Sequence, residues 1–226
     1  AVLKVLPLGI DNEGTAQENA LQGILRGVVM KEVQPIRDTK KIDAMKSIMK
    51  GESNYRDLLL FTLGINTGLR ISDILGLKWG SFLNGGGKLL KAGDQLDVVE
   101  IKTKKVKTFV INKSVAEALK LYYDSLDSVS PDAPVFSSRK SDNGSPKALS
   151  RVGAWMLLNR YAHMVGLDDG IGTHTLRKTF GYHLYKKGVA LEYIQKMLNH
   201  SSPAITLRYI GITQDQLNGI YYELNL

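Results

Sequence analysis

The sequence contains no cysteine among its 226 residues. That absence excludes disulfides, thiolate zinc sites, iron–sulfur clusters and cysteine nucleophiles, and it suits the reducing cytoplasm. Long apolar runs are also lacking, because the longest, from Leu58 to Ile65, is interrupted by Thr62 and Gly64 and is far shorter than the ~20 residues that span a membrane. We therefore expect a cytoplasmic protein with no membrane partner.

Sequence signals for nucleotides and metals are missing as well. Gly87-Lys88 is followed by Leu89 rather than by Ser or Thr, so no phosphate-binding loop is indicated. The four histidines form no His-Glu-x-x-His pair, and the acidic residues have neither calcium-loop nor two-metal spacing. We expect neither a metal nor another cofactor.

What the sequence does contain is an excess of positive charge and enough apolar material for a folded core. Hydrophobic residues make up 43% of the chain, and the formal net charge is +8. Residues 1–29 hold two basic and three acidic side chains, so the excess belongs to the remainder. Such a field suits an anionic partner. The predicted organisation is a leader or remnant of a preceding segment at residues 1–35, then one domain at residues 36–226.

The apolar spacing in this domain predicts a mainly helical fold with one small antiparallel sheet. Asp38 is a plausible cap for a first helix that ends near Gly51, and Ser53 or Asn54 can cap a second, apolar helix before a turn at residues 66–68. A hairpin is expected between residues 84 and 112, and Ser114 with Glu117 forms a capping box for the next helix. A loop is predicted over residues 137–146, followed by helices at about 150–165, 175–187, 190–199, 203–209 and 213–223.

Three polar segments stand out against this pattern. Arg70 follows a glycine turn, His174 and Arg177 lie three apart on one predicted helical face, and His200 precedes a short helix that ends in Tyr209. Each segment alone is most simply a solvated or structural feature. Together they resemble the tyrosine recombinase family, the phage-integrase-like enzymes. The motifs that carry the resemblance are Thr67-Gly68-x-Arg70-x-x-Asp73 with Leu77 and Trp79, His174-x-x-Arg177, Leu198-Asn199-His200-Ser201, and Tyr209 nine residues after His200.

The resemblance implies a set of site residues and a mechanism. Arg70 and Arg177 would stabilise negative charge on the phosphate, His174 and His200 would donate hydrogen bonds or serve as base, and Tyr209 would form a 3′-phosphotyrosyl ester. Lys102, interpreted as the last residue of the first strand, would protonate the leaving 5′ oxygen, with Lys104 and Lys105 as alternatives or as phosphate contacts. Asp73 is either a group that orients an arginine or an ordinary acid at a helix N-terminus. Lys147 and Arg151 are candidates for DNA contacts or a solvated helix start.

The implied partner is double-stranded DNA, bound by a homotetramer, with DNA-bending proteins as candidate accessory partners. Family members usually carry a further helical domain before the catalytic one, and the residues before Lys40 are too few for it. The sequence is therefore interpreted as a catalytic fragment or a minimal recombinase. Two other functions stay open, namely strand cleavage like that of type IB topoisomerases and telomere resolvases, and a DNA-binding accessory role without cleavage.

Overall fold

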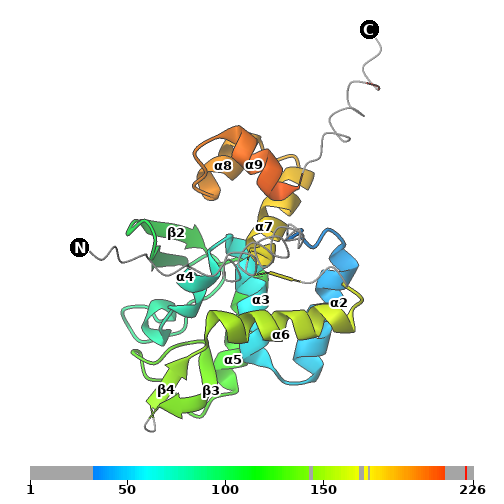
Figure 1. Ribbon diagram of the computed structural model, residues 1–226. Coiled ribbons are helices and arrows are strands. Elements are labelled where there is room, and N and C mark those ends of the chain that lie inside the picture. Colours follow the sequence, from blue (N-terminus) through cyan, green and yellow to red (C-terminus); the bar gives the residue numbers. More distant parts are fainter. Residues whose placement is uncertain (1–32, 143–144, 168–170, 173, 212–221, 223–226) are drawn as a thin grey trace, which may run out of the picture. The chain divides into compact units, whose positions relative to one another are not determined.

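Helices dominate the computed structural model of the protein, which describes residues 33–142, 145–167, 171–172, 174–211 and 222 (Figure 1). The helices are α2 (Thr39–Gly51), α3 (Tyr55–Thr67), α4 (Ile71–Leu75), α5 (Lys113–Asp124), α6 (Arg151–Met164), α7 (Thr175–Lys186), α8 (Leu191–Met197) and α9 (Pro203–Ile210), with a 3-10 turn, η1 (Trp79–Phe82). Four short strands form two separate antiparallel hairpins, β1 (Gln95–Val99) with β2 (Val106–Val110) and β3 (Ser137–Asp142) with β4 (Ser145–Ala148). The predicted mainly helical fold is confirmed.

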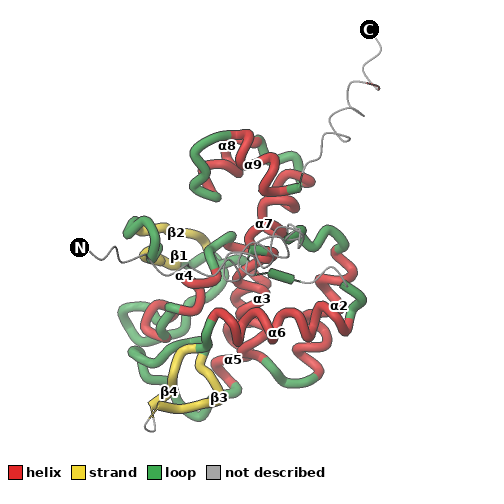
Figure 2. Tube along the Cα trace, in the orientation of Figure 1, coloured by secondary structure: helices red, strands yellow, loops and turns green. Residues whose placement is uncertain are grey.

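Helix α3 is the centre of the main core. Its side chains from Leu58 to Leu63 are almost fully buried on every face, as expected of a helix that is apolar all round. Helices α2, α5 and α7 pack against it (Figures 1 and 2). The last turn of α3 therefore has a fixed position, and this is the turn that leads into the segment with Arg70.

Local sequence signals explain where several helices begin and end. The Asp38 side chain accepts a hydrogen bond from the backbone N–H of Lys40 and caps α2, as predicted. Gly68 ends α3 with a φ of 61°, a left-handed conformation that favours glycine. Ser202 caps α9 and Pro203 occupies its first turn. The second helix is preceded by Asn54, one of the two predicted caps, although its side chain makes no capping bond.

Three predictions of local structure were wrong. Helix α5 is capped by Asn112, whose side chain accepts from the backbone N–H of Val115, so the Ser114–Glu117 capping box lies within the helix. The predicted loop at residues 137–146 contains the β3–β4 hairpin, which makes two small sheets rather than one. The first strand of the other hairpin ends at Val99, where it pairs with Val106, and therefore stops before Lys102.

Helices α8 and α9 share a second, much smaller apolar cluster with α7. Its buried members are Phe180, Ile194, Leu198 and Ile210. These two short helices lie at the end of α7 away from α6 (Figure 1). The fold thus has a large core around α3 and a small one under α8 and α9.

All described residues belong to one compact unit that begins at Val33. The predicted leader and the predicted final helix at about 213–223 fall almost entirely outside the described residues, so the boundary near residue 35 stays a prediction. No helix in the described part of the chain combines the length and the apolar character that crossing a membrane requires.

Candidate active site

Arg177 lies in the first half of α7 with only 4% of its surface exposed. Its guanidinium donates hydrogen bonds to two backbone carbonyls, those of Gly68 after α3 and Leu198 after α8. Burial lowers the pKa of Arg177, and the neighbouring Arg70 lowers it further. The guanidinium therefore joins the main core to the α8–α9 segment while it carries the positive charge of the site.

Arg70 is the residue immediately before α4, and its side chain is held by two carboxylates. Its Nη1 lies 2.9 Å from Oε1 of Glu100 and 3.9 Å from Oδ2 of Asp73. Burial alone would raise the pKa of Glu100, but a hydrogen bond from Thr103 and the charge of Arg70 outweigh it and hold the pKa below its usual value. The guanidinium is thus oriented by a charged partner.

Asp73 is buried beneath this pair, with 2% of its surface exposed. Its Oδ1 accepts a hydrogen bond of 2.9 Å from the backbone N–H of Ile101, in the turn of the β1–β2 hairpin. A solvated acid at a helix N-terminus would make no such contact. The geometry favours the interpretation that Asp73 positions Arg70 and the hairpin.

Tyr209, near the end of α9, meets both predicted histidines. Its hydroxyl is 3.1 Å from Nδ1 of His174, the residue before α7. The His200 ring lies edge-on to the Tyr209 ring, with centroids 4.8 Å apart, and its Nδ1 is 3.1 Å from the Thr206 hydroxyl. The structure therefore brings Tyr209, His174 and His200 together with Arg177.

The charges of this site favour neutral imidazoles and a neutral phenol before substrate binds. Burial raises the pKa of Tyr209, and the charge and hydrogen bond of Arg177 oppose that rise. Burial and the charge of Arg177 lower the pKa of His174, and they lower that of His200 to about 4. A neutral His174 can accept a proton from the phenol beside it.

The hairpin lysines lie in the turn between β1 and β2, whereas Lys102 was predicted to be the last residue of the first strand. Lys102, Lys104 and Lys105 are exposed in the turn between the strands, and Lys104 has a left-handed φ of 56°. The strand ends at Val99 because the turn closes between Glu100 and Lys105, whose backbones are hydrogen-bonded. The Lys102 side chain is therefore not directed by strand pairing.

Two charged residues of the site were missed by sequence reasoning, Glu100 and Lys107. Lys107 projects from β2, and its Nζ is 2.9 Å from the Met197 carbonyl and 3.4 Å from that of Thr67. Alternation could have found both, because Glu100 continues the inward positions of Leu96 and Val98 and Lys107 shares a face with Phe109. A charged residue at an inward position of a strand that otherwise alternates apolar and polar residues is a candidate for a functional site.

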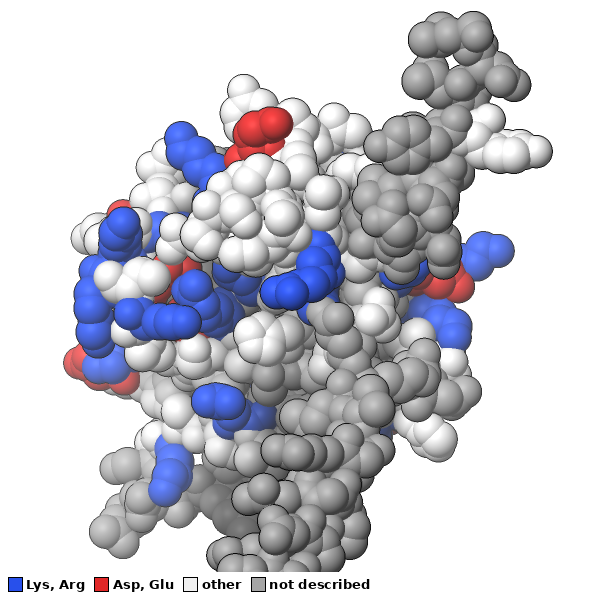
Figure 3. All heavy atoms as spheres, turned by 45° about the horizontal axis from the view of Figure 1, so that its top comes forward, with Lys and Arg blue, Asp and Glu red and all other residues white. Residues whose placement is uncertain are grey.

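Lys147 lies in β4 and Arg151 is the first residue of α6. The charge of Arg151 contributes to the low pKa of His174. Figure 3 shows Lys and Arg side chains gathered on the side of the β1–β2 hairpin and across the centre of the face, with few acidic residues among them. This face presents positive charge around the site.

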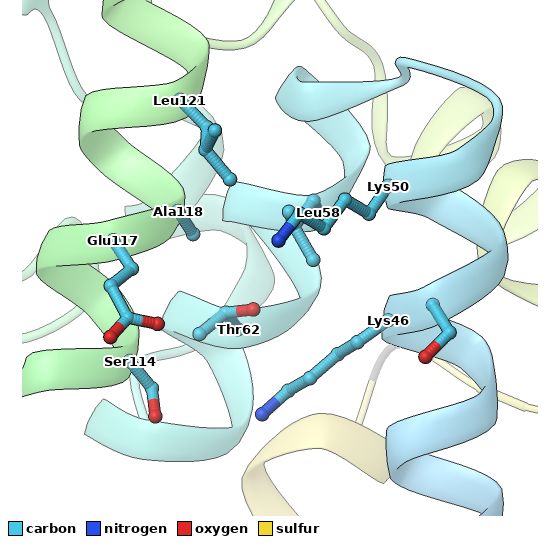
Figure 4. Close-up of a pocket in the computed structure, with 9 residues that line it drawn as sticks. Lys46, Lys50, Leu58, Thr62, Ser114, Glu117, Ala118 and Leu121 are labelled. Carbon is cyan, nitrogen blue, oxygen red and sulfur yellow. The ribbon is translucent and has the colours of Figure 1, made fainter.

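A separate cavity of about 170 Å³ lies between α2, α3 and α5. Lys46 and Lys50 line it from α2, Ser114 and Glu117 from α5, and Thr62 lies between them on α3 (Figure 4). None of the predicted site residues lines this cavity. Within the described ranges, no three His, Asp or Glu side chains form a group that could hold a metal ion.

Comparison with known proteins gives the family. The model of the phage integrase family matches residues 38–216. The chain belongs to the phage integrase family. It is 40% identical over 189 residues to the probable integrase/recombinase YoeC of Bacillus subtilis, a match that covers 84% of this chain and 95% of that protein.

Other relatives of this family member are longer. Tyrosine recombinase XerC of Pelobacter propionicus is 26% identical, over 81% of this chain and 57% of that protein. Among solved structures, XerA recombinase has a TM-score of 0.64 at 17% identity and covers 87% of this chain and 66% of that one. XerH bound to difH substrate in a post-cleavage complex has a TM-score of 0.62 at 22% identity, over 85% of this chain and 54% of that one. These similarities confirm the fold, and the chain spans little more than half the length of several relatives.

Proposed function

We propose that this protein is a tyrosine-type DNA recombinase that cuts and rejoins DNA strands through a covalent 3′-phosphotyrosyl intermediate. The observation that carries the proposal is the contact of 3.1 Å between the Tyr209 hydroxyl and His174 Nδ1, beside a buried arginine. A nucleophile, a base and a fixed cation are the parts that phosphoryl transfer to a hydroxyl requires.

In the cleavage step the Tyr209 oxygen forms a bond to the scissile phosphorus, and the bond from phosphorus to the 5′ oxygen breaks. His174 accepts the phenolic proton at Nδ1, which requires the tautomer that carries its hydrogen on Nε2. Lys102 delivers a proton to the departing 5′ oxygen. The energy of the broken ester is retained in the phosphotyrosyl bond, so a second 5′ hydroxyl can attack it and rejoin a strand.

Arg70 and Arg177 stabilise the negative charge that develops on the non-bridging oxygens. Glu100 forms an ion pair with Arg70 Nη1, so an entering phosphate competes with this carboxylate. His200 stands against Tyr209 and is oriented by Thr206. Its role is to donate from Nε2 to the phosphate, which requires the tautomer in which Nδ1 accepts a hydrogen bond from the Thr206 hydroxyl. Asp73 acts by holding Arg70.

The partner is double-stranded DNA, and the basic face around the site supplies contacts to its phosphates. Lys104, Lys105, Lys147 and Arg151 belong to this contact surface. We infer that the protein works as a tetramer on DNA, with DNA-bending proteins as candidate helpers. Residues 36–226 form the catalytic domain in this proposal.

The test is covalent trapping on a nicked suicide substrate that carries a candidate attachment sequence. Wild type should form an adduct on the 3′ phosphate that persists in a denaturing gel, and Tyr209→Phe should form none. Tyr182→Phe, a tyrosine of α7 outside the site, is the matched control and should retain the adduct. Salt-dependent DNA binding by wild type without any adduct would favour the accessory role without cleavage.

A further inference from the structure

Lys107 contributes to the site although no motif includes it. Its ammonium contacts the carbonyl oxygens of Thr67 and Met197, which are the last residues of α3 and α8. Helix C-termini present unpaired carbonyls and partial negative charge. The Lys107 ammonium therefore contacts carbonyl oxygens at the ends of two helices, one in the main core around α3 and one in the smaller cluster under α8 and α9.

Arg177 makes the same connection one residue further along each segment. It donates to the carbonyls of Gly68 and Leu198, which directly follow the two residues that Lys107 contacts. Two consecutive carbonyls at the end of α3 and two at the end of α8 thus accept hydrogen bonds from two neighbouring cations. We call Lys107, Arg177 and these four carbonyls the two-cation bridge.

The α8–α9 segment needs such a connection because its own apolar anchoring is small. Among the described residues, the buried cluster beneath it consists of Phe180 of α7, Ile194 of α8, Leu198 after α8 and Ile210 of α9. On the hairpin side, a cavity of about 160 Å³ separates β2 from the end of α8, lined by Glu100, Lys105, Lys107 and Met197 among others. Lys107 reaches across this gap, where apolar packing does not fill the space.

We propose that Lys107 is a positioning residue that, together with Arg177, fixes the α8–α9 segment and so places His200 and Tyr209 against the arginines. The inference rests on the proposed recombinase function. Met197 lies three residues before His200, so a shift of the α8 end moves His200 and the start of α9 with it. The role differs from that of Lys102, which acts on the leaving oxygen.

The charge state of Lys107 gives this role a distinctive pH dependence. Burial and the charge of Arg177 lower the pKa of Lys107 to about 8. Glu100 in the hairpin turn and Arg70 and Asp73 at α4 also act on this pKa, and the ammonium-bearing side chains of Lys105 and Lys196 line the same cavity as Lys107. Because charge-assisted hydrogen bonds are stronger than neutral ones, the bridge weakens as pH rises through about 8.

The experiment measures the rate of covalent adduct formation at saturating DNA. Lys107→Met should slow the reaction about 10- to 100-fold, as expected for a misplaced nucleophile, with the affinity for DNA within twofold of wild type. Lys120→Met, an exposed lysine of α5, is the matched control and should react at the wild-type rate. An unchanged rate for Lys107→Met would overturn the inference.

A substrate with sulfur in place of the bridging 5′ oxygen separates positioning from proton donation. A thiol has a pKa of about 8.5, so a thiolate leaves without a proton. This substrate should restore the rate of Lys102→Ala and leave Lys107→Met slow. Restoration of Lys107→Met by sulfur would make Lys107 the proton donor and overturn the positioning role.

The pH profile of Lys107→Arg on the sulfur substrate keeps the test valid even if Lys107→Met fails to fold. The wild-type rate should fall above about pH 8, whereas the arginine variant should keep its rate because its guanidinium stays charged. The same alkaline fall in both proteins would overturn the inference. If the wild-type protein forms no adduct, the proposed function is overturned and this inference falls with it. If the wild-type protein and Lys107→Met react at the same rate, only this inference is overturned.

Discussion

The two halves of the site are anchored in different ways. Arg70 and Arg177 adjoin the last turn of α3, where the main core surrounds the helix. His200 and Tyr209 lie on the α8–α9 segment, whose buried apolar side chains among the described residues are Ile194, Leu198 and Ile210. The half that holds the two arginines is thus fixed by a large core. The half that holds Tyr209 depends on polar bridges, so its position can change without unfolding the rest of the protein.

The largest effect is expected where the two halves are joined. Arg177→Met removes the cation from the phosphate and leaves the carbonyls of Gly68 and Leu198 without their donor. We expect covalent cleavage to fall below detection and the free energy of unfolding to drop by about 2–4 kcal/mol. Adduct formation and urea denaturation measure the two effects. An active, equally stable variant would contradict the assignment of Arg177 to both tasks.

Matched leucine truncations in the two cores sharpen the comparison. Leu60 and Leu198 are both fully buried, and truncation of such a leucine to alanine costs about 2–5 kcal/mol. Leu60→Ala should lower the midpoint of global unfolding. Leu198→Ala should instead slow adduct formation with a smaller shift of the global midpoint, as followed by tryptophan fluorescence from the main core. Equal shifts of the midpoint would show that the α8–α9 segment is not energetically separate.

A substitution at Asn199, which lies between α8 and His200, should have a smaller effect and should stabilise the fold. Asn199 has a φ of 50°, a left-handed conformation that favours glycine. Asn199→Gly removes the strain of a side chain in this conformation, which is worth about 0.5–1 kcal/mol. We expect a slightly higher melting temperature in thermal denaturation with unchanged cleavage. A lower melting temperature would show that the Asn199 side chain stabilises the turn.

The effect of His200 protonation on stability is absent at neutral pH and appears only in acid. Its pKa of about 4 in the folded state lies below the usual value of 6.5, so the unfolded chain binds more protons between these values. Stability from this group is fully present above pH 6.5 and is lost as pH falls toward 4. The pH dependence of urea unfolding should be shallower in His200→Asn over this range. An identical slope would contradict the low pKa.

Some of this architecture could be predicted from sequence because its signals are local. Asp38, Gly68 and Pro203 mark helix ends through capping and backbone preferences that need no tertiary contact. The β3–β4 hairpin could not be predicted, since its strands, Ser137–Asp142 and Ser145–Ala148, lack β-branched and aromatic residues.

The site residues also divide into those that the sequence could predict and those that it could not. The family motifs named His174, His200 and Tyr209 as site residues, and the structure places both histidine rings beside Tyr209. The hairpin was less predictable, because β1 ends before Lys102 and no motif marks Glu100 or Lys107. Their positions follow from strand register and from helix ends that are far apart in the sequence.

Native-state hydrogen exchange is the most direct test of the difference between the two halves. Amides of α3 at Leu59 and Leu63 should exchange only through global unfolding, while those of α9 at Thr206 and Ile210 should exchange through a local opening of lower free energy. We predict exchange at least about tenfold faster in α9, and faster still in Lys107→Met. Equal protection of α3 and α9, unaffected by Lys107→Met, would contradict the account.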